Sequence, residues 1–275
     1  MSRMTLALVV TLPLLAFQPG VAQLAPDQAK IAAVTAGTLK EARASWWGFD
    51  PEDSTAQLQA AINSGVPKLI VDKMPGPWIV TPISLVSNQE IVFEEGVEVI
   101  AKRGEFKAKT ASLFTAANQE NITLRGYGAT WRMWREDYDN PQLYEKAEWR
   151  HCLSIRSSSN ITVLGLTLTD SGGDGIYLGT ATAGVTNRNI IIRDVTCDRN
   201  YRQGISVITA ENLLIENCRL TNTNGTPPRA GIDFEPNLPG ERLVNCVMRN
   251  CHIENNAGNG IVMYLRPLNA TSEPV

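Results

Sequence analysis

The stretch NITVLGLTLTDSGGDGIYLG, from Asn160 to Gly179, opens with an asparagine, runs through a β-rich segment and a polar turn, and ends in Gly-Ile-x-apolar. The same order of features returns further along the chain. The later copies are NIIIRDVTCDRNYRQGISVI from Asn189, NLLIENCRLTNTNGTPPRAGIDFEP from Asn212 and NCVMRNCHIENNAGNGIVMYL from Asn245. Repeated copies of one short unit indicate a repeat architecture.

The spacing and content of the unit decide which repeat architecture it is. Its glycines lie 29, 27 and 29 residues apart, at Gly175, Gly204, Gly231 and Gly260. Units of this length that hold short strands and no helical period predict an all-β parallel solenoid, with coils about 4.8 Å apart. Ankyrin and tetratricopeptide arrays are excluded because each unit would need amphipathic helices. The repeated asparagines, from Asn121 to Asn245, are expected to form an internal amide ladder.

Composition excludes several other classes of protein. The 275 residues are 43% hydrophobic and 19% charged, with a formal charge of −3, which excludes intrinsic disorder. Without a basic excess, neither a nucleic acid nor an anionic membrane is an expected partner. Five cysteines without a CxxC pair, and only two histidines, predict no metal site of the zinc type.

The N-terminal part of the chain divides into three segments. Residues 1–22 have the pattern of a secretory signal peptide, so we expect a secreted or periplasmic protein that has no membrane contact after cleavage. Residues 23–49 are expected to be a linker. From residue 50 the β-helix domain extends to residue 275, and the run from Asp53 to Gly65 predicts a capped amphipathic helix that covers its open end.

Two features interrupt or end the repeat. Residues 128–149, rich in aromatic and polar side chains, are expected to form an insertion. After Leu265 the sequence contains no second lid, so either a partner covers that end or the chain is a truncated piece of a longer solenoid, which is the expectation we favour.

The segments DSTAQLQAAINSG, SNQEIVFEEGVEVIA, NITLRGYGATW, SGGDGIYLG, RQGISVI and AGIDFEPN together resemble the right-handed parallel β-helix proteins of the pectin-lyase-like superfamily, in particular secreted bacterial β-helix repeat proteins. The resemblance covers residues 50–265 and implies this fold. It does not imply one activity, because the superfamily includes lyases, hydrolases, epimerases and adhesins. Where its polygalacturonases carry Asp-Asp and then Gly-His-Gly, this chain has Gly173-Asp174-Gly175 and Arg202-Gln203-Gly204.

A pair of carboxylates marks the first candidate site. If Ile232 and Phe234 point inward, strand alternation places Asp233 and Glu235 on the outer face, about 7 Å apart at the backbone. Glycosidases use two carboxylates at separations of about 5 to 9.5 Å, one protonated and one ionised. We therefore predict that Asp233 and Glu235 are catalytic, although solvated surface acids would give the same pattern.

Asp174 and His151 occupy matching positions on neighbouring coils, so they are expected to lie about 5 Å apart and to assist catalysis. Turn capping by Asp174 and a structural role for His151 are the alternatives. Tyr177, Ser206 and Asp233 are expected to share an outward column that lines one groove. The candidates for substrate binding lie near the same strand starts: Arg202, Gln203, Arg229, Tyr177, Arg150 and Trp149. The aromatic side chains of the insertion, among them Trp131, Trp134, Tyr138 and Tyr144, either form a sugar-stacking wall or pack the insertion down.

The sequence thus predicts a secreted, carbohydrate-active β-helix enzyme, of which the expected partner is an acidic or sulfated polysaccharide and the expected reaction glycoside hydrolysis without a cofactor. One alternative is a polysaccharide lyase or uronate epimerase in the same groove, with Ca²⁺ on Asp174 or Asp233. A second is a non-catalytic glycan-binding or surface module. Neither the sugar nor the linkage follows from the residues.

Overall fold

The computed structural model describes residues 21–275, so the expected signal peptide, residues 1–22, lies almost wholly outside the described part. Within residues 21–275 the strands form three parallel sheets of eight, seven and seven strands. Sheet 1 contains β1 (Glu41–Arg43), β2 (Lys68–Val71), β5 (Gln89–Phe93), β8 (Glu120–Arg125), β11 (Ser159–Leu164), β14 (Asn187–Arg193), β17 (Ala210–Glu216) and β20 (Leu243–Arg249).

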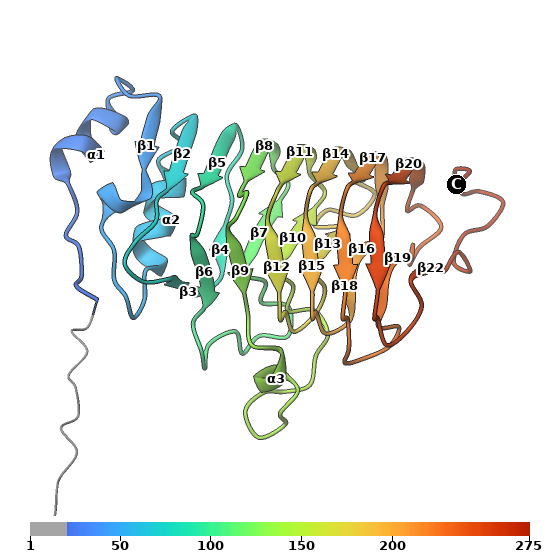
Figure 1. Cartoon of the computed structure of the whole chain (residues 1–275). Coiled ribbons are helices and arrows are strands. Elements are labelled where there is room, and N and C mark those ends of the chain that lie inside the picture. The colour runs from blue at the N-terminus through green and yellow to red at the C-terminus, as the bar shows by residue number, and fades with distance from the viewer. Residues whose placement is uncertain (1–20) are drawn as a thin grey trace, which may run out of the picture.

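Sheets 2 and 3 complete each coil. Sheet 2 contains β3 (Trp78–Val80), β6 (Glu98–Ala101), β9 (Thr130–Arg132), β12 (Thr167–Thr169), β15 (Thr196–Asp198), β18 (Arg219–Thr221) and β21 (His252–Glu254). Sheet 3 contains β4 (Ile83–Ser84), β7 (Phe114–Ala117), β10 (Leu153–Arg156), β13 (Ile176–Gly179), β16 (Gln203–Val207), β19 (Ala230–Phe234) and β22 (Ile261–Met263). The chain passes from sheet 1 to sheet 2 to sheet 3 in every coil from β2-β3-β4 to β20-β21-β22, which confirms the predicted parallel β-helix (Figure 1).

Strand alternation fills the interior with apolar ladders. In sheet 3, Ile176, Ile205 and Ile232 lie side by side on successive coils, and all three are fully buried. Aromatic rings fill the interior of the N-terminal coils, where the Trp131 ring stacks on Phe114 with centroids 4.0 Å apart. Each added coil extends a core that no single coil could bury, which is the reason that the repeat specifies the fold.

The N-terminal end is closed as expected, but by more of the chain than expected. Helix α2 (Thr55–Asn63) buries Leu58, Ala61 and Ile62 against the first coil. The segment 23–49 is no linker: it forms α1 (Gln28–Thr35), β1 paired with β2, and η1 (Ala44–Trp47). Its apolar side chains explain this correction, since Phe49 is fully buried and packs edge-to-face on Trp78.

The predicted asparagine ladder is present, but its location differs from the expectation. The Nδ2 atom of each asparagine donates to Oδ1 of the asparagine on the preceding coil, over 2.8 to 3.0 Å, along Asn88, Asn121, Asn160, Asn189, Asn212 and Asn245. These residues have φ between 52° and 64°. This left-handed conformation, which asparagine tolerates better than most residues, turns the side chains outward. The ladder is therefore exposed rather than internal.

The insertion begins later than the predicted range 128–149, because β9 pairs with β6 and β12 inside sheet 2. After Arg132 the chain leaves the coil, forms α3 (Arg135–Tyr138) and returns to sheet 3 at β10 (Figure 1). We call residues 133–149 the excursion. No helix in the described part of the chain is long and apolar enough to cross a bilayer.

The two ends of the stack differ. At the C-terminal end, the described residues place no helix over the last coil, and Ile261, Met263 and Tyr264 are about half exposed.

Candidate functional site

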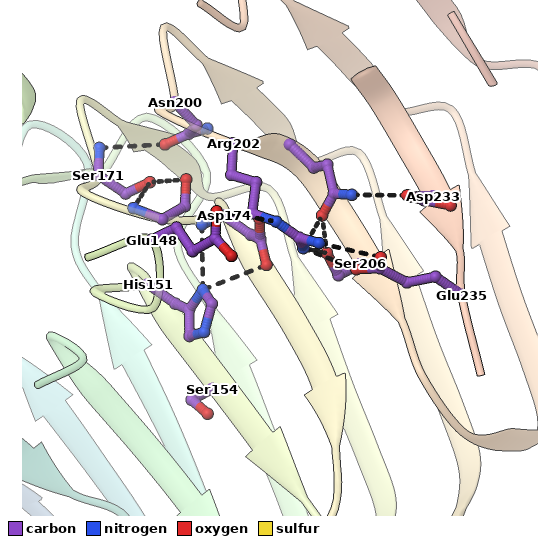
Figure 2. Close-up of polar contacts among 12 residues, drawn as sticks. Glu148, His151, Ser154, Ser171, Asp174, Asn200, Arg202, Ser206, Asp233 and Glu235 are labelled. Atoms are coloured by element: carbon purple, nitrogen blue, oxygen red, sulfur yellow. Dashed lines mark hydrogen bonds and ion pairs between the residues drawn. The ribbon is translucent and has the colours of Figure 1, made fainter. Parts of the chain in front are cut away.

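The candidate site lies where the turns from sheet 2 enter sheet 3. His151, Asp174 and Gln203 each come two residues before the paired positions Leu153, Ile176 and Ile205. The outward positions of the following strands form a second column, in which Ser154, Tyr177, Ser206 and Asp233 are neighbours. Both predicted columns are therefore confirmed. They bring residues from β10, β13, β16 and β19 to one face (Figure 2).

His151 and Asp174 form the contact that the register predicts. The Nδ1 atom of His151 lies 3.2 Å from Oδ2 of Asp174 and accepts a hydrogen bond from the Asp174 backbone N–H at 3.0 Å. The imidazole also stacks on the Tyr177 ring, with centroids 4.6 Å apart and planes 7° from parallel. The His151 and Asp174 side chains are 1% and 0% exposed, so in this structure they shape the site from below its surface.

A second network joins the two predicted catalytic carboxylates to a neighbouring coil (Figure 2). Arg202 donates two hydrogen bonds to Glu235, at 2.6 and 2.9 Å, and a third to Oε1 of Gln203 at 2.8 Å. Gln203 in turn donates through Nε2 to Oδ2 of Asp233 at 2.8 Å, and the Ser206 hydroxyl donates to Oε1 of Gln203. Asp233 is 2% exposed, whereas the side chains of Glu235 and Arg202 keep 13% and 15% of their surface.

This environment favours the protonated form of Asp233 and the charged form of Arg202. Burial, which disfavours the charged carboxylate, and the nearby Glu235 carboxylate raise the pKa of Asp233 to about 7, although Arg202 opposes the shift. Burial disfavours the charged form of Arg202 as well, but Asp174 and Glu235 outweigh this and raise its pKa. Glu235 receives the bidentate, charge-assisted contact that arginine makes with an ionised carboxylate.

Arg150 does not belong to the substrate-binding set. Its side chain is fully buried, and it donates to the carbonyl oxygens of Phe106 at 2.8 Å and of Lys107 and Glu145 at 3.1 Å. It therefore binds the excursion to the loop before β7. Burial lowers the pKa of Arg150. The prediction failed because it assumed that Arg150 points outward like Arg202.

The remaining predicted binding residues divide into two groups. Tyr177 lies within the site, and Trp149 is 43% exposed where the excursion returns to the coil. Arg229, which was predicted to bind substrate, forms no ion pair with the described residues, in contrast to Arg202.

The wall of aromatic side chains is also absent. Trp131 belongs to the core, and Tyr138 and Tyr144 are buried against each other, with ring centroids 4.9 Å apart. Trp134 is partly buried and donates through Nε1 to the Ala101 carbonyl oxygen at 2.6 Å. Among the aromatic residues of this region, Trp149 alone is exposed.

Sequence reasoning missed one member of the network and one contact of another. Glu148, from the excursion, lies 3.8 Å from Nε of Arg202 and gives this arginine a second acidic neighbour. Ser206 lies in the predicted outward column beside Asp233, but its contact with the Gln203 amide was not predicted. No sequence signal existed for Glu148, because its position depends on the path of the excursion.

Potential metal ligands do not gather at this site. Residues 21–275 contain no group of three or more His, Cys, Asp or Glu side chains arranged to hold a metal ion. The five cysteines are free, so the disulfide that an exported protein could form is absent.

Comparison with known proteins agrees with the architecture. Residues 144–272 match the family described as the right handed beta helix region. Over 165 residues the chain is 28% identical to the uncharacterized protein YclG of Bacillus subtilis strain 168, covering 56% of this chain and 28% of YclG. The chain therefore has the right-handed parallel β-helix fold.

Two solved structures share the fold. The pre-mature gene product 12 of bacteriophage phi29 is 20% identical, with a TM-score of 0.57 over 86% of this chain and 34% of that one. A ι-carrageenase complexed to ι-carrageenan fragments is 17% identical, with a TM-score of 0.55 over 77% of this chain and 47% of that one. The chain spans less than half the length of each of these proteins, and just over a quarter of YclG.

Proposed function

We propose that this β-helix protein hydrolyses glycosidic bonds in an acidic or sulfated polysaccharide. The observation that carries the proposal is the Asp233–Glu235 pair at the C-terminal end of β19, in which Asp233 has a pKa raised to about 7 and Glu235 is held by Arg202. Glycoside hydrolysis needs one carboxyl group that donates a proton and one carboxylate that activates water or attacks the sugar. Near neutral pH the raised pKa of Asp233 keeps part of its carboxyl group protonated, and Arg202 offers Glu235 the paired hydrogen bonds that suit a carboxylate.

The contacts assign the roles. Gln203 donates a hydrogen bond to Oδ2 of Asp233, whereas Oδ1 has no hydrogen-bond partner among the described residues. Oδ1 is therefore the atom that carries the proton donated to the leaving oxygen. Glu235, the more exposed of the two, is the base or nucleophile. Arg202 orients Glu235 and offers its charge to an anionic substituent of the sugar. His151 and Asp174 act as positioning residues because they are buried beneath Tyr177 and beside Arg202.

The similarity to a ι-carrageenase supports a polysaccharide as the partner, since that protein has the same fold and was solved in complex with ι-carrageenan fragments. Fold likeness does not itself select an activity. The chemistry of the site carries the reaction, and the leader pattern in residues 1–22 supports export as part of the proposal.

The test compares the wild type with Asp233→Asn and Glu235→Gln on a panel of sulfated and uronate-containing polysaccharides. The matched control is Glu216→Gln, because Glu216 also lies between arginines, at 2.7 Å from Arg193 and 2.6 Å from Arg249, but on sheet 1. Each site variant is expected to lower the rate of reducing-end release at least about a hundredfold, the usual contribution of acid–base groups, and the control is expected to match wild type.

Three outcomes would contradict the proposal. Activity that survives both site substitutions would remove the Asp233–Glu235 assignment. Products with the ultraviolet absorbance of an unsaturated uronate would replace hydrolysis with elimination. A folded wild type that binds a polysaccharide and never cleaves it would instead indicate a binding module.

A further inference from the structure

Arg156 is a cation of the site face for which neither the fold nor the catalytic pair provides an acidic partner. It lies on the outward side of β10, where its Nε atom donates to the Ser154 hydroxyl at 2.8 Å. Its guanidinium carbon lies 5.2 Å from the centroid of the Tyr177 ring. Within residues 21–275 Arg156 forms no ion pair, in contrast to Arg202, which contacts Glu235 and Glu148. The Arg156 charge is therefore oriented but not neutralised.

The Tyr177 ring forms the surface beside this cation. A Cβ atom built on Gly179 would lie 2.1 Å from Cε1 of Tyr177 and 2.4 Å from its hydroxyl oxygen, so the phenol lies directly over Gly179. Gly179 pairs with Arg156 across the sheet. The absence of a side chain at Gly179 thus lets an aromatic ring lie flat beside the guanidinium, with His151 stacked on that ring.

The same row of outward positions connects Arg156 to the catalytic pair. Arg156 pairs with Gly179, and the registers of β13 with β16 and of β16 with β19 continue this row through Ile208 to Glu235. Three steps between parallel strands correspond to about 14 Å along the axis of the β-helix. A ligand that contacts both ends must therefore be an extended oligomer.

We propose that Arg156 and Tyr177 form a second binding subsite, which takes a sugar residue bearing a sulfate or carboxylate group three coils away from Glu235. Guanidinium groups bind both anions through paired hydrogen bonds, and an aromatic ring offers a face to the sugar. That the ligand is a polysaccharide rests on the proposed function. The subsite makes affinity depend on the charge of the polymer at a distance from the bond that is cleaved.

The test measures the dissociation constant by calorimetry for wild type, Arg156→Ala and Arg188→Ala. Arg188 is the control because its side chain is 56% exposed on sheet 1, away from this face. The probes are a sulfated galactan hexasaccharide with its desulfated counterpart, and a galacturonate hexasaccharide with its methyl ester. The disaccharide of each charged series is measured as well.

Arg156→Ala is expected to weaken binding of one charged hexasaccharide about tenfold, equivalent to about 1.4 kcal/mol, and the series affected identifies the anion. Arg156→Ala should bind the neutral hexasaccharides as wild type does, because they lack the anion, and also the disaccharides, because they are too short to span the row. Arg188→Ala should match wild type with every probe, because Arg188 lies on sheet 1 outside the subsite. Equal affinity of Arg156→Ala and wild type for both charged hexasaccharides would overturn the inference. So would an equal loss with the neutral counterparts, or a wild type that binds neither series. A charge-dependent loss in a protein that cleaves nothing would retain the subsite and refute only the hydrolase.

Discussion

The stability of Asp233→Asn relative to wild type is expected to rise as the pH rises. The pKa of Asp233 is raised from 3.8 to about 7, a shift of about 3 units, and each unit corresponds to about 1.4 kcal/mol. Between these two values the folded protein keeps a proton that the unfolded chain releases. The free energy of unfolding therefore falls by about 1.4 kcal/mol per pH unit, with a total loss of about 4 kcal/mol above pH 7.

Asparagine at position 233 carries no charge at any pH, so this loss disappears in the variant. The difference in unfolding free energy, variant minus wild type, should rise by about 4 kcal/mol between pH 4 and pH 8. Urea unfolding followed by tryptophan fluorescence at several pH values measures it, with Asp198→Asn on sheet 2 as the control. A difference that does not change with pH would refute the reasoning, because it would mean that the folded structure does not favour the protonated form of Asp233.

Three further predictions concern the surroundings of the site. Gly179→Ala should displace the Tyr177 ring and lower affinity for the charged polymer as Arg156→Ala does, whereas Gly240→Ala, which meets no atom within 4 Å, should match wild type in calorimetry. Arg150→Met should leave three backbone carbonyl oxygens without their donor and cost several kcal/mol, seen as faster proteolysis within residues 133–149; unchanged protease resistance would count against this anchor role. Asn212→Ala removes two side-chain hydrogen bonds and places alanine at φ 59°, so urea unfolding should show that the free energy of unfolding falls by about 2 kcal/mol. A decrease below the experimental error would contradict a stabilising role for the ladder.

The fold was predictable from the sequence because one pattern repeats at equivalent positions of the four coils that begin at β11, β14, β17 and β20. Where a residue lies in a strand or next to one, the period of two and the coil spacing place it correctly. This is the case for the Tyr177–Ser206–Asp233 column and for the contact between His151 and Asp174. The register alone was enough for these predictions.

The errors occur where the chain leaves the repeat or where the backbone conformation changes. Arg150 contacts carbonyl oxygens of Phe106 and Lys107, more than forty residues earlier, because of the path of the excursion, and no local pattern encodes that path. The asparagine ladder was predicted in the correct residues but on the wrong face, since strand alternation does not hold at a residue with positive φ. Segment 23–49 lacks the repeat pattern, so its packing through Phe49 could not be recognised.

The most direct test of the account is hydrolysis of a charged polysaccharide in water enriched in oxygen-18, with the products analysed by mass spectrometry for wild type and Asp233→Asn. The account predicts that wild type places one labelled oxygen in each new reducing end, none in the new non-reducing end, and that Asp233→Asn releases almost no product. Unlabelled products that have lost the elements of water would show elimination. Labelled products released equally fast by Asp233→Asn would show that the acid on β19 does not donate the proton.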